Sequence, residues 1–155
     1  MRSIALFIVS ATWLAAADPA GFAQWEGSEL KSYEKKLAPK VDAKKIASQP
    51  LGSYGNHSLS VIHREGSGEA ELHETQGDIF IVQSGEATLI VGGTVVDPKN
   101  TAPHEVRGPS IKDGVSKQIG PGDIVHIAAQ TPHQLMVPAG KQVTYAIVKV
   151  NAECR

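Results

Sequence analysis

Hydrophobic and polar residues alternate over short runs along most of the chain. In the run 78–84, Phe80 and Val82 would point to one face of a strand, and Ile79 and Ile81 to the other. Gly and Pro separate such runs, which is typical of all-β proteins with tight turns. The pattern predicts an antiparallel sandwich or barrel. Its strands are expected at 58–63, 69–73, 78–84, 87–91, 93–96, 116–119, 123–127, 134–137 and 142–150.

Two segments differ from this pattern. Residues 28–37, SELKSYEKKL, have a helix-forming composition with Ser28 as the candidate N-cap, and Pro39 ends the helix. Residues 97–114 are polar, contain three prolines and show no period, so we expect a long loop of the kind that forms lids or binding loops. Strands that are apolar on both faces need a second layer, which the helix or a second copy of the chain would provide. A homodimer is therefore expected.

Composition narrows the function classes. The chain has 155 residues, enough for one domain with a buried core, and a formal net charge of −1. Lys35-Lys36 and Lys44-Lys45 lie in a mixed-charge segment, and 5% of the residues are aromatic, so we expect no nucleic-acid partner. Cys154 is the only cysteine, which excludes an internal disulfide.

The N-terminus is typical of a secretory signal peptide. Arg2 precedes an apolar run from 4 to 17, shorter than the roughly 20 residues of a membrane span, and small residues follow. We expect cleavage after Ala23; cleavage after Ala17 and a retained anchor are the alternatives. The protein would be periplasmic or secreted, without membrane contact after cleavage. The expected organisation is a signal peptide at 1–23, a helix and arm at 24–57, the barrel at 58–151 and a tail at 152–155.

The stretch 71–85, ELHETQGDIFIVQSG, carries the candidate chemistry. Because alternate residues of a strand face the same side, Glu71 and His73 point together. Asp78 opens the next strand after a bend, so its carboxylate can turn back towards the same space. His133 begins a later strand. Imidazole and carboxylate ligands together suit Mn, Fe, Zn or Ni.

The spacing of these residues resembles the two conserved motifs of the cupins. The first motif is usually His-x-His, four residues, Glu, six residues and Gly, a spacing that positions 71, 73, 78 and 85 match. The second is usually Gly, five residues, Pro-x-Gly, two residues and His, a spacing that positions 122, 128, 130 and 133 match. The chain departs from the usual residues of the motifs at Glu71, Asp78, Ala128 and Gln130.

The resemblance spans roughly 58–150 and implies a double-stranded β-helix, a jelly-roll-like antiparallel barrel. It also implies one divalent metal ion inside the barrel, with Glu71, His73, Asp78 and His133 as ligands. Asp78 is one methylene shorter than the usual Glu, so it is alternatively a hydrogen-bond acceptor for His73. Some cupins have lost the metal and bind a ligand or hold a dimer together, and Glu71 would then be a free acid in the pocket.

The expected function is that of an exported metallo-cupin that performs isomerase- or lyase-type chemistry on a small sugar derivative or organic acid. Glu71 or His126 would move the proton, although the side that His126 faces stays open. Arg107 is the candidate clamp for a substrate carboxylate or phosphate, and His63 is a candidate contact at the barrel mouth. An Fe(II)-dependent dioxygenase and a non-catalytic periplasmic protein that binds a metal or small ligand are the alternatives.

Overall fold

The computed structural model describes residues 18–152 and contains one α-helix, α1 (Gly27–Leu37), followed by the short 3-10 helix η1 (Ala38–Lys40). The apolar run at 4–17 and Cys154 lie outside the described residues. The remaining elements are strands, which confirms the predicted all-β fold with one short helix. They are β1 (Ile46–Ser53), β2 (His57–Arg64), β3 (Ala70–His73), β4 (Gln76–Gly85), β5 (Ala87–Val91), β6 (Thr94–Val95), β7 (Lys99–Ala102), β8 (Glu105–Gly108), β9 (Ile111–Lys112), β10 (Val115–Ile119), β11 (Ile124–Ile127), β12 (His133–Met136) and β13 (Val143–Asn151).

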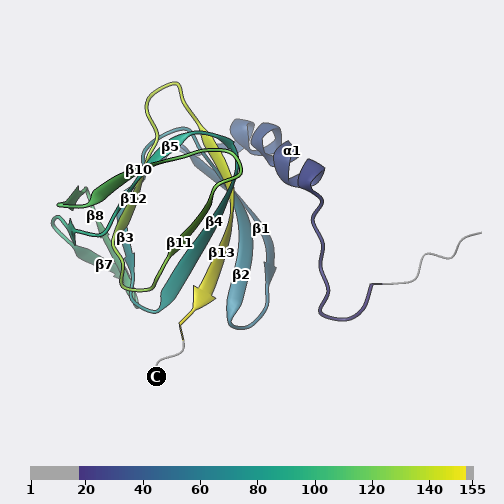
Figure 1. The fold of residues 1–155 in the computed structure, drawn as a ribbon, viewed down its shortest axis with the longest axis horizontal. Helices are drawn as coiled ribbons and strands as arrows, with labels where there is room; N and C mark the ends of the chain where they lie inside the picture. The colour runs from purple at the N-terminus through teal and green to yellow at the C-terminus, as the bar shows by residue number, and fades with distance from the viewer. Residues whose placement is uncertain (1–17, 153–155) are drawn as a thin grey trace, which may run out of the picture.

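Two antiparallel sheets face each other and form the barrel (Figure 1). One has five strands in the order β1-β2-β13-β4-β11, and the other has six in the order β10-β5-β12-β3-β8-β7. The short strands β6 and β9 pair separately. Many neighbouring strands, such as β13 and β4 or β12 and β3, come from distant parts of the chain, so residues far apart in sequence meet inside the barrel.

The main core lies between the two sheets. Phe80 and Val82 of β4 point into it and are buried, while Ile79 and Ile81 lie on the outer face and are half-buried. This confirms the predicted alternation along β4. The other buried members of this core are Ala87, Leu89, Ile119, Ile127, Leu135, Val137, Val143, Tyr145 and Ile147.

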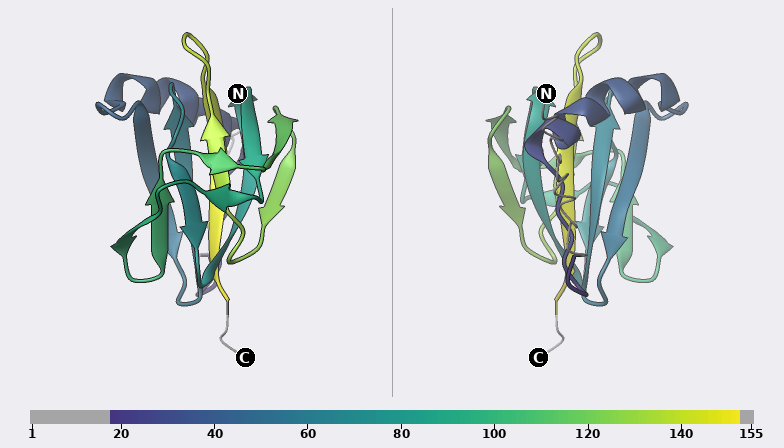
Figure 2. Two further views of the ribbon diagram at one scale, coloured as in Figure 1. Left: turned by 90° about the vertical axis from the view of Figure 1, so that its left-hand side faces the viewer. Right: turned by 90° about the vertical axis from the view of Figure 1, so that its right-hand side faces the viewer.

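Helix α1 supplies a second layer on the outer face of the five-stranded sheet (Figure 2). Its last residue, Leu37, is buried against Ala47 of β1 and Val61 of β2. The helix begins at Gly27 with Glu26 as its N-cap, and the hydroxyl of Ser28 donates to the Glu26 carboxylate instead of capping the helix. The predicted Ser28 cap is therefore wrong. The homodimer stays a prediction.

Two parts of the chain differ from the sequence prediction. The five-stranded sheet begins at Ile46, within the segment expected to be an arm, because β1 pairs with β2. The segment 97–114 is not an unstructured loop, since it contains β7, β8 and β9. Strand β8 pairs with β3, and its residues Glu105 and Arg107 lie opposite His73 and Glu71. These strands are short and polar, so they lack the apolar alternation that identifies a strand in sequence.

Within residues 18–152, no helix has both the length and the apolar character that crossing a membrane requires.

Candidate metal centre

Side chains from both sheets converge at one point inside the barrel. Glu71 and His73 come from β3, and the pairing of β12 with β3 sets His133 opposite Glu71. Asp78 comes from β4 of the other sheet, and its side chain is 2% exposed. The structure therefore brings together all four residues that the sequence predicts as metal ligands.

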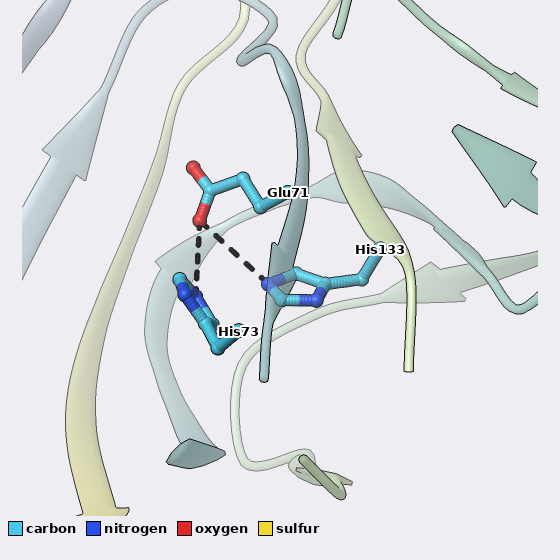
Figure 3. Close-up of side chains that lie close together, drawn as sticks. All are labelled: Glu71, His73 and His133. Carbon is cyan, nitrogen blue, oxygen red and sulfur yellow. Dashed lines mark ion pairs between the residues drawn. The ribbon is translucent and has the colours of Figure 1, made fainter. Parts of the chain in front are cut away.

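The distances between the donor atoms are those of a coordination shell. Glu71 Oε2 lies 3.4 Å from His73 Nε2 and 3.7 Å from His133 Nε2, as the dashed lines of Figure 3 mark. Asp78 Oδ2 lies 3.4 Å from His73 Nε2 and 3.6 Å from His133 Nε2. Ligands about 2.1 Å from a tetrahedral ion are separated by about 3.4 Å. Glu71, His73 and His133 each offer one ligand atom within 4.8 Å of the others, so these three residues can hold a divalent ion, and Asp78 lies beside both imidazoles.

Hydrogen bonds orient both imidazoles towards this point. Nδ1 of His73 lies 2.7 and 2.8 Å from the two carboxylate oxygens of Glu105, and Nδ1 of His133 lies 3.1 Å from the carbonyl oxygen of Thr131. Both partners accept only, so each Nδ1 carries a hydrogen, and in the neutral imidazole each Nε2 has the lone pair that a metal ion would take. Such acceptors behind histidine ligands are the usual support of a metal site.

Lys149 is a member of the site that sequence analysis missed. It lies on β13 opposite Asp78, and its Nζ is 2.9 Å from Asp78 Oδ1 and 2.9 Å from His73 Nε2. Its ammonium is thus in contact with two of the four candidate ligands. A signal was present, since Lys149 follows Tyr145 and Ile147 at the inward positions of an otherwise apolar strand.

Ion pairs tie Glu71 and Glu105 to two arginines. Arg107 Nη1 lies 2.8 Å from Glu71 Oε2, and Arg107 Nη2 lies 3.0 Å from Glu105 Oε2. Arg64 Nη2 lies 3.7 Å from Glu71 Oε1. Arg107, the predicted substrate clamp, therefore lies at the site, but its guanidinium is already engaged by two carboxylates.

These contacts set the protonation of the buried acids. Burial alone would raise the pKa of Glu71, but its contacts with His73, Arg107 and His133 outweigh burial and lower that pKa to about 2. Burial would likewise raise the pKa of Asp78, yet His133, His73 and Lys149 hold it far below its usual range. Both candidate ligands are therefore ionised at neutral pH, as metal binding requires.

The pKa of His73 shifts upward, opposite to the pKa values of Glu71 and Asp78. Burial lowers its pKa, but the carboxylates of Asp78 and Glu71 outweigh burial and raise the pKa to about 9. A protonated His73 would direct an N–H at Lys149 Nζ, so the 2.9 Å contact belongs to the neutral imidazole. In either state the carboxylates attract a cation to this point: a proton, the lysine ammonium or a metal ion.

A cavity of about 190 Å³ adjoins the site, and its wall includes the apolar side chains of Phe80, Leu135 and Ile147. A second cavity of about 460 Å³, the outer chamber, lies beside this inner cavity, and Arg64, Glu71 and Arg107 are in the walls of both. A small molecule in the inner cavity would therefore lie against an apolar wall and next to the candidate ligands.

Two predicted site residues lie elsewhere. His126, on the edge strand β11, is exposed on the outer face of the five-stranded sheet beside Ile79. His63 is 1% exposed, and its Nδ1 lies 2.8 Å from Thr144 Oγ1. Neither lines the inner cavity. Alternation along β2 explains the position of His63, because its neighbour Arg64 takes the inward position.

Comparisons with known proteins identify the fold. No family model matches the chain, and no curated protein matches it. A protein with a double-stranded β-helix domain from Klebsiella pneumoniae is 15% identical over 76% of this chain and 90% of its own, with a TM-score of 0.53. A cupin-2 domain from Rhodospirillum rubrum is 18% identical over 71% of this chain and 62% of its own, with a TM-score of 0.51. The DMSP lyase DddQ from Ruegeria pomeroyi is 14% identical over 72% of this chain and 49% of its own, with a TM-score of 0.50.

The chain therefore has the cupin fold, the double-stranded β-helix that its two sequence motifs predict. It spans about half the length of the lyase that it matches. Inside that fold, Glu71, His73 and His133 form a possible metal site, and Asp78 Oδ2 lies 3.4 Å from His73 Nε2 and 3.6 Å from His133 Nε2.

Proposed function

We propose that the protein is an exported metal-dependent cupin enzyme that performs isomerase- or lyase-type chemistry on a small organic acid or sugar derivative. The observation that supports it best is the orientation of the two imidazoles. Glu105 and the carbonyl of Thr131 hold Nδ1 of His73 and His133, and both Nε2 atoms face two ionised carboxylates at 3.4–3.7 Å. Such preorganisation costs stability unless a cation binds there.

An ion held by Glu71, His73, Asp78 and His133 would act as a Lewis acid that polarises a carbonyl or carboxylate oxygen of the substrate. With a pKa of about 2, Glu71 stays ionised and suits a ligand better than a proton carrier. The inner cavity offers Tyr145 and Lys149 as groups with transferable protons. The burial of Tyr145 raises its pKa, so its phenol keeps its proton at neutral pH. Isomerase and lyase reactions both need such a proton movement beside a polarised oxygen.

The shared fold with solved cupin proteins supports an isomerase or lyase function only by analogy. One solved protein of this fold is named a lyase. The periplasmic or secreted location rests on the N-terminal sequence. The homodimer rests on the outer face of the five-stranded sheet, where Ile79 and Ile81 are half-buried and Ile124 of the edge strand is 72% exposed.

One observation favours a second candidate, a metal-free cupin that binds a small anion without reaction. The ammonium of Lys149 already contacts Asp78 and His73, so it could neutralise the donor set in place of a metal ion. In that protein Lys149, Arg64 and Arg107 would present cationic groups to a ligand.

A turnover experiment separates the candidates. The purified protein, loaded in turn with Mn, Fe, Zn or Ni, is incubated with a panel of small carboxylic acids and sugar derivatives, and products are detected by proton NMR. Turnover under argon that is lost in His133→Ala would support the isomerase or lyase. Turnover that requires oxygen and Fe(II) would indicate the dioxygenase. Ligand binding without any turnover, with or without metal, would favour the binding protein.

A further inference from the structure

Arg64 pairs only loosely with the candidate ligand Glu71, yet its side chain lies beside the candidate metal centre. It is the last residue of β2, and its side chain is 12% exposed. The same side chain lines both the inner cavity and the outer chamber. Its guanidinium therefore stands where a molecule passing from the outer chamber towards the metal ligands would meet it.

The guanidinium of Arg64 lacks a close acidic partner among the described residues. Its ion pair with Glu71 Oε1 spans 3.7 Å, and its Nε is buried with no hydrogen-bond partner within residues 18–152. Arg107 lies closer to its acidic partners, at 2.8 Å from Glu71 and 3.0 Å from Glu105, although its Nη1 also lacks a partner in hydrogen-bond geometry among the described residues. The Tyr145 hydroxyl is a neutral partner of the Arg64 guanidinium, but Nε of Arg64 stays unpaired and no carboxylate lies close, so an anion that binds there would recover part of the free energy that burial costs.

The position of the guanidinium is built into the fold. It lies over Gly68, where a Cβ atom would be 3.0 Å from Arg64 Nη1 and 3.2 Å from Arg64 Cζ. The backbone of Gly68 is held on both sides, since its N–H donates to the carbonyl of Leu135 and its carbonyl accepts from the amide of Gln134. The absence of a side chain at position 68 thus gives Arg64 its space.

The surroundings define the chemistry of the ligand. Ile62, Phe80, Leu135 and Ile147 form an apolar wall of the inner cavity. Lys44 adds a positive charge and Glu69 a negative charge in the outer chamber. A planar guanidinium matches a carboxylate in two parallel hydrogen bonds. Arg107 and Lys149 also line the cavity, but carboxylates engage both of them. The apolar wall beside Arg64 suits a small acid with a hydrocarbon part better than a polyhydroxylated sugar.

From this arrangement we propose that Arg64 anchors the carboxylate of a small aliphatic monocarboxylic acid, whose hydrocarbon part lies against Phe80 and Leu135. The proposal adds a substrate class to the proposed function. Binding at Arg64 does not depend on that function, but the reaction that follows binding does. Arg64 is not a candidate metal ligand, so the anchor can be tested in the absence of metal.

The test uses sodium butyrate as the probe and butyramide as its uncharged counterpart. Binding to the purified protein, treated with EDTA or loaded with Mn²⁺, is followed by calorimetry and by NMR line broadening of the probe, at concentrations up to about 10 mM. We expect saturable butyrate binding that weakens at least tenfold in Arg64→Met, with butyramide binding weakly and equally to both proteins. Lys117→Met, on the exposed strand β10, is the matched control and should bind butyrate as the wild type does.

If Arg64→Met does not fold, Gly68→Ala is the second variant. It keeps the charge of Arg64 but crowds its guanidinium, so butyrate binding should weaken severalfold. Equal butyrate binding by wild type and Arg64→Met, or no binding to the wild type, would overturn the proposal. Inorganic phosphate that binds more tightly than butyrate would overturn the carboxylate class. Arg64-dependent binding that persists in EDTA, in a protein that never retains metal, would leave the anchor standing and remove the metal-dependent function.

Discussion

Lys149 Nζ lies 2.9 Å from His73 Nε2, the nitrogen whose lone pair faces the other candidate ligands. The same ammonium contacts both oxygens of Asp78, at 2.9 and 3.2 Å. An internal cation therefore shares two donors with the proposed metal ion. Metal binding would require the ammonium to leave these donors, and the flexible lysine stem allows it to do so.

The first prediction concerns Lys149→Met, which keeps much of the side-chain volume and removes the charge. Because the competing cation is gone, we expect Mn²⁺ and Zn²⁺ to bind about tenfold more tightly, a change that corresponds to one charged hydrogen bond. Calorimetric titration measures this affinity, and Lys117→Met serves as the control. Unchanged or weaker binding would show that Lys149 does not compete with the metal.

The same variant should be less stable without metal. Asp78 is 2% exposed and would lose the ammonium that lies 2.9 Å from its Oδ1, so we expect the free energy of unfolding in EDTA to fall by about 2–3 kcal/mol. Urea denaturation of the two metal-free proteins gives this difference. Equal stability would mean that the Lys149–Asp78 contact contributes little.

The second prediction concerns the acceptor behind His73. Glu105→Gln would replace the carboxylate that holds Nδ1 with a weaker and less basic partner, so metal affinity should fall about 10- to 100-fold. Glu74→Gln is the matched control, because Glu74 pairs only with the exposed His104 among the described residues. If Glu105→Gln and the control bound metal equally, the imidazole would not depend on this support.

The third prediction is a pH dependence of the metal-free protein. His73 has a raised pKa of about 9, so its contribution to stability is complete below about pH 6.5 and is lost as the pH rises through 9. Glu71 has a lowered pKa of about 2, so its contribution is complete above about pH 4.5 and is lost as the pH falls through 2. Thermal unfolding in EDTA should therefore show a maximum between these limits. The alkaline decline should be smaller in His73→Gln, and an equal decline would assign it to other groups.

The sequence could predict that Glu71 and His73 lie together because strand alternation is local, whereas the cupin fold and the full set of candidate ligands were implied by the resemblance of the motifs. Glu71 and His73 share a face whatever the rest of the chain does, and the bend before Asp78 fixes its position nearby. Gly85 has a φ of 73°, and a Cβ there would collide with the carbonyl of Gln142, which explains the glycine in the motif. Gln130 adopts a φ of 65° where the motif usually has glycine, so the turn keeps its shape despite the substitution.

The partners of these ligands could not be predicted, because they depend on which strands pair across the barrel. Glu105 reaches His73 only because β8 adds to the edge of β3, and the segment that contains β8 resembles a loop in sequence. Lys149 reaches Asp78 through the pairing of β13 with β4. The inward or outward direction of His126 was equally open, because Val125 and Ile127 beside it are both apolar.

The fourth prediction concerns export. When the full-length chain is expressed in a Gram-negative host, the protein should appear in the periplasmic fraction with an N-terminus at Gln24, or at Asp18 if cleavage follows Ala17. Intact-mass spectrometry distinguishes the two. A protein that retains Met1 and fractionates with membranes would support the anchor instead.

The central claim is that Glu71, His73, Asp78 and His133 hold one metal ion, and metal content tests it most directly. The protein purified without chelator, and its His73→Ala and His133→Ala variants, are analysed by plasma mass spectrometry, with His104→Ala as the exposed-histidine control. We predict about one Mn, Fe, Zn or Ni ion per chain in the wild type and control. Both site variants should lose it while their far-UV circular dichroism stays unchanged. A wild type that retains no metal, even after reconstitution, would contradict the account and leave Lys149 as the cation of the site.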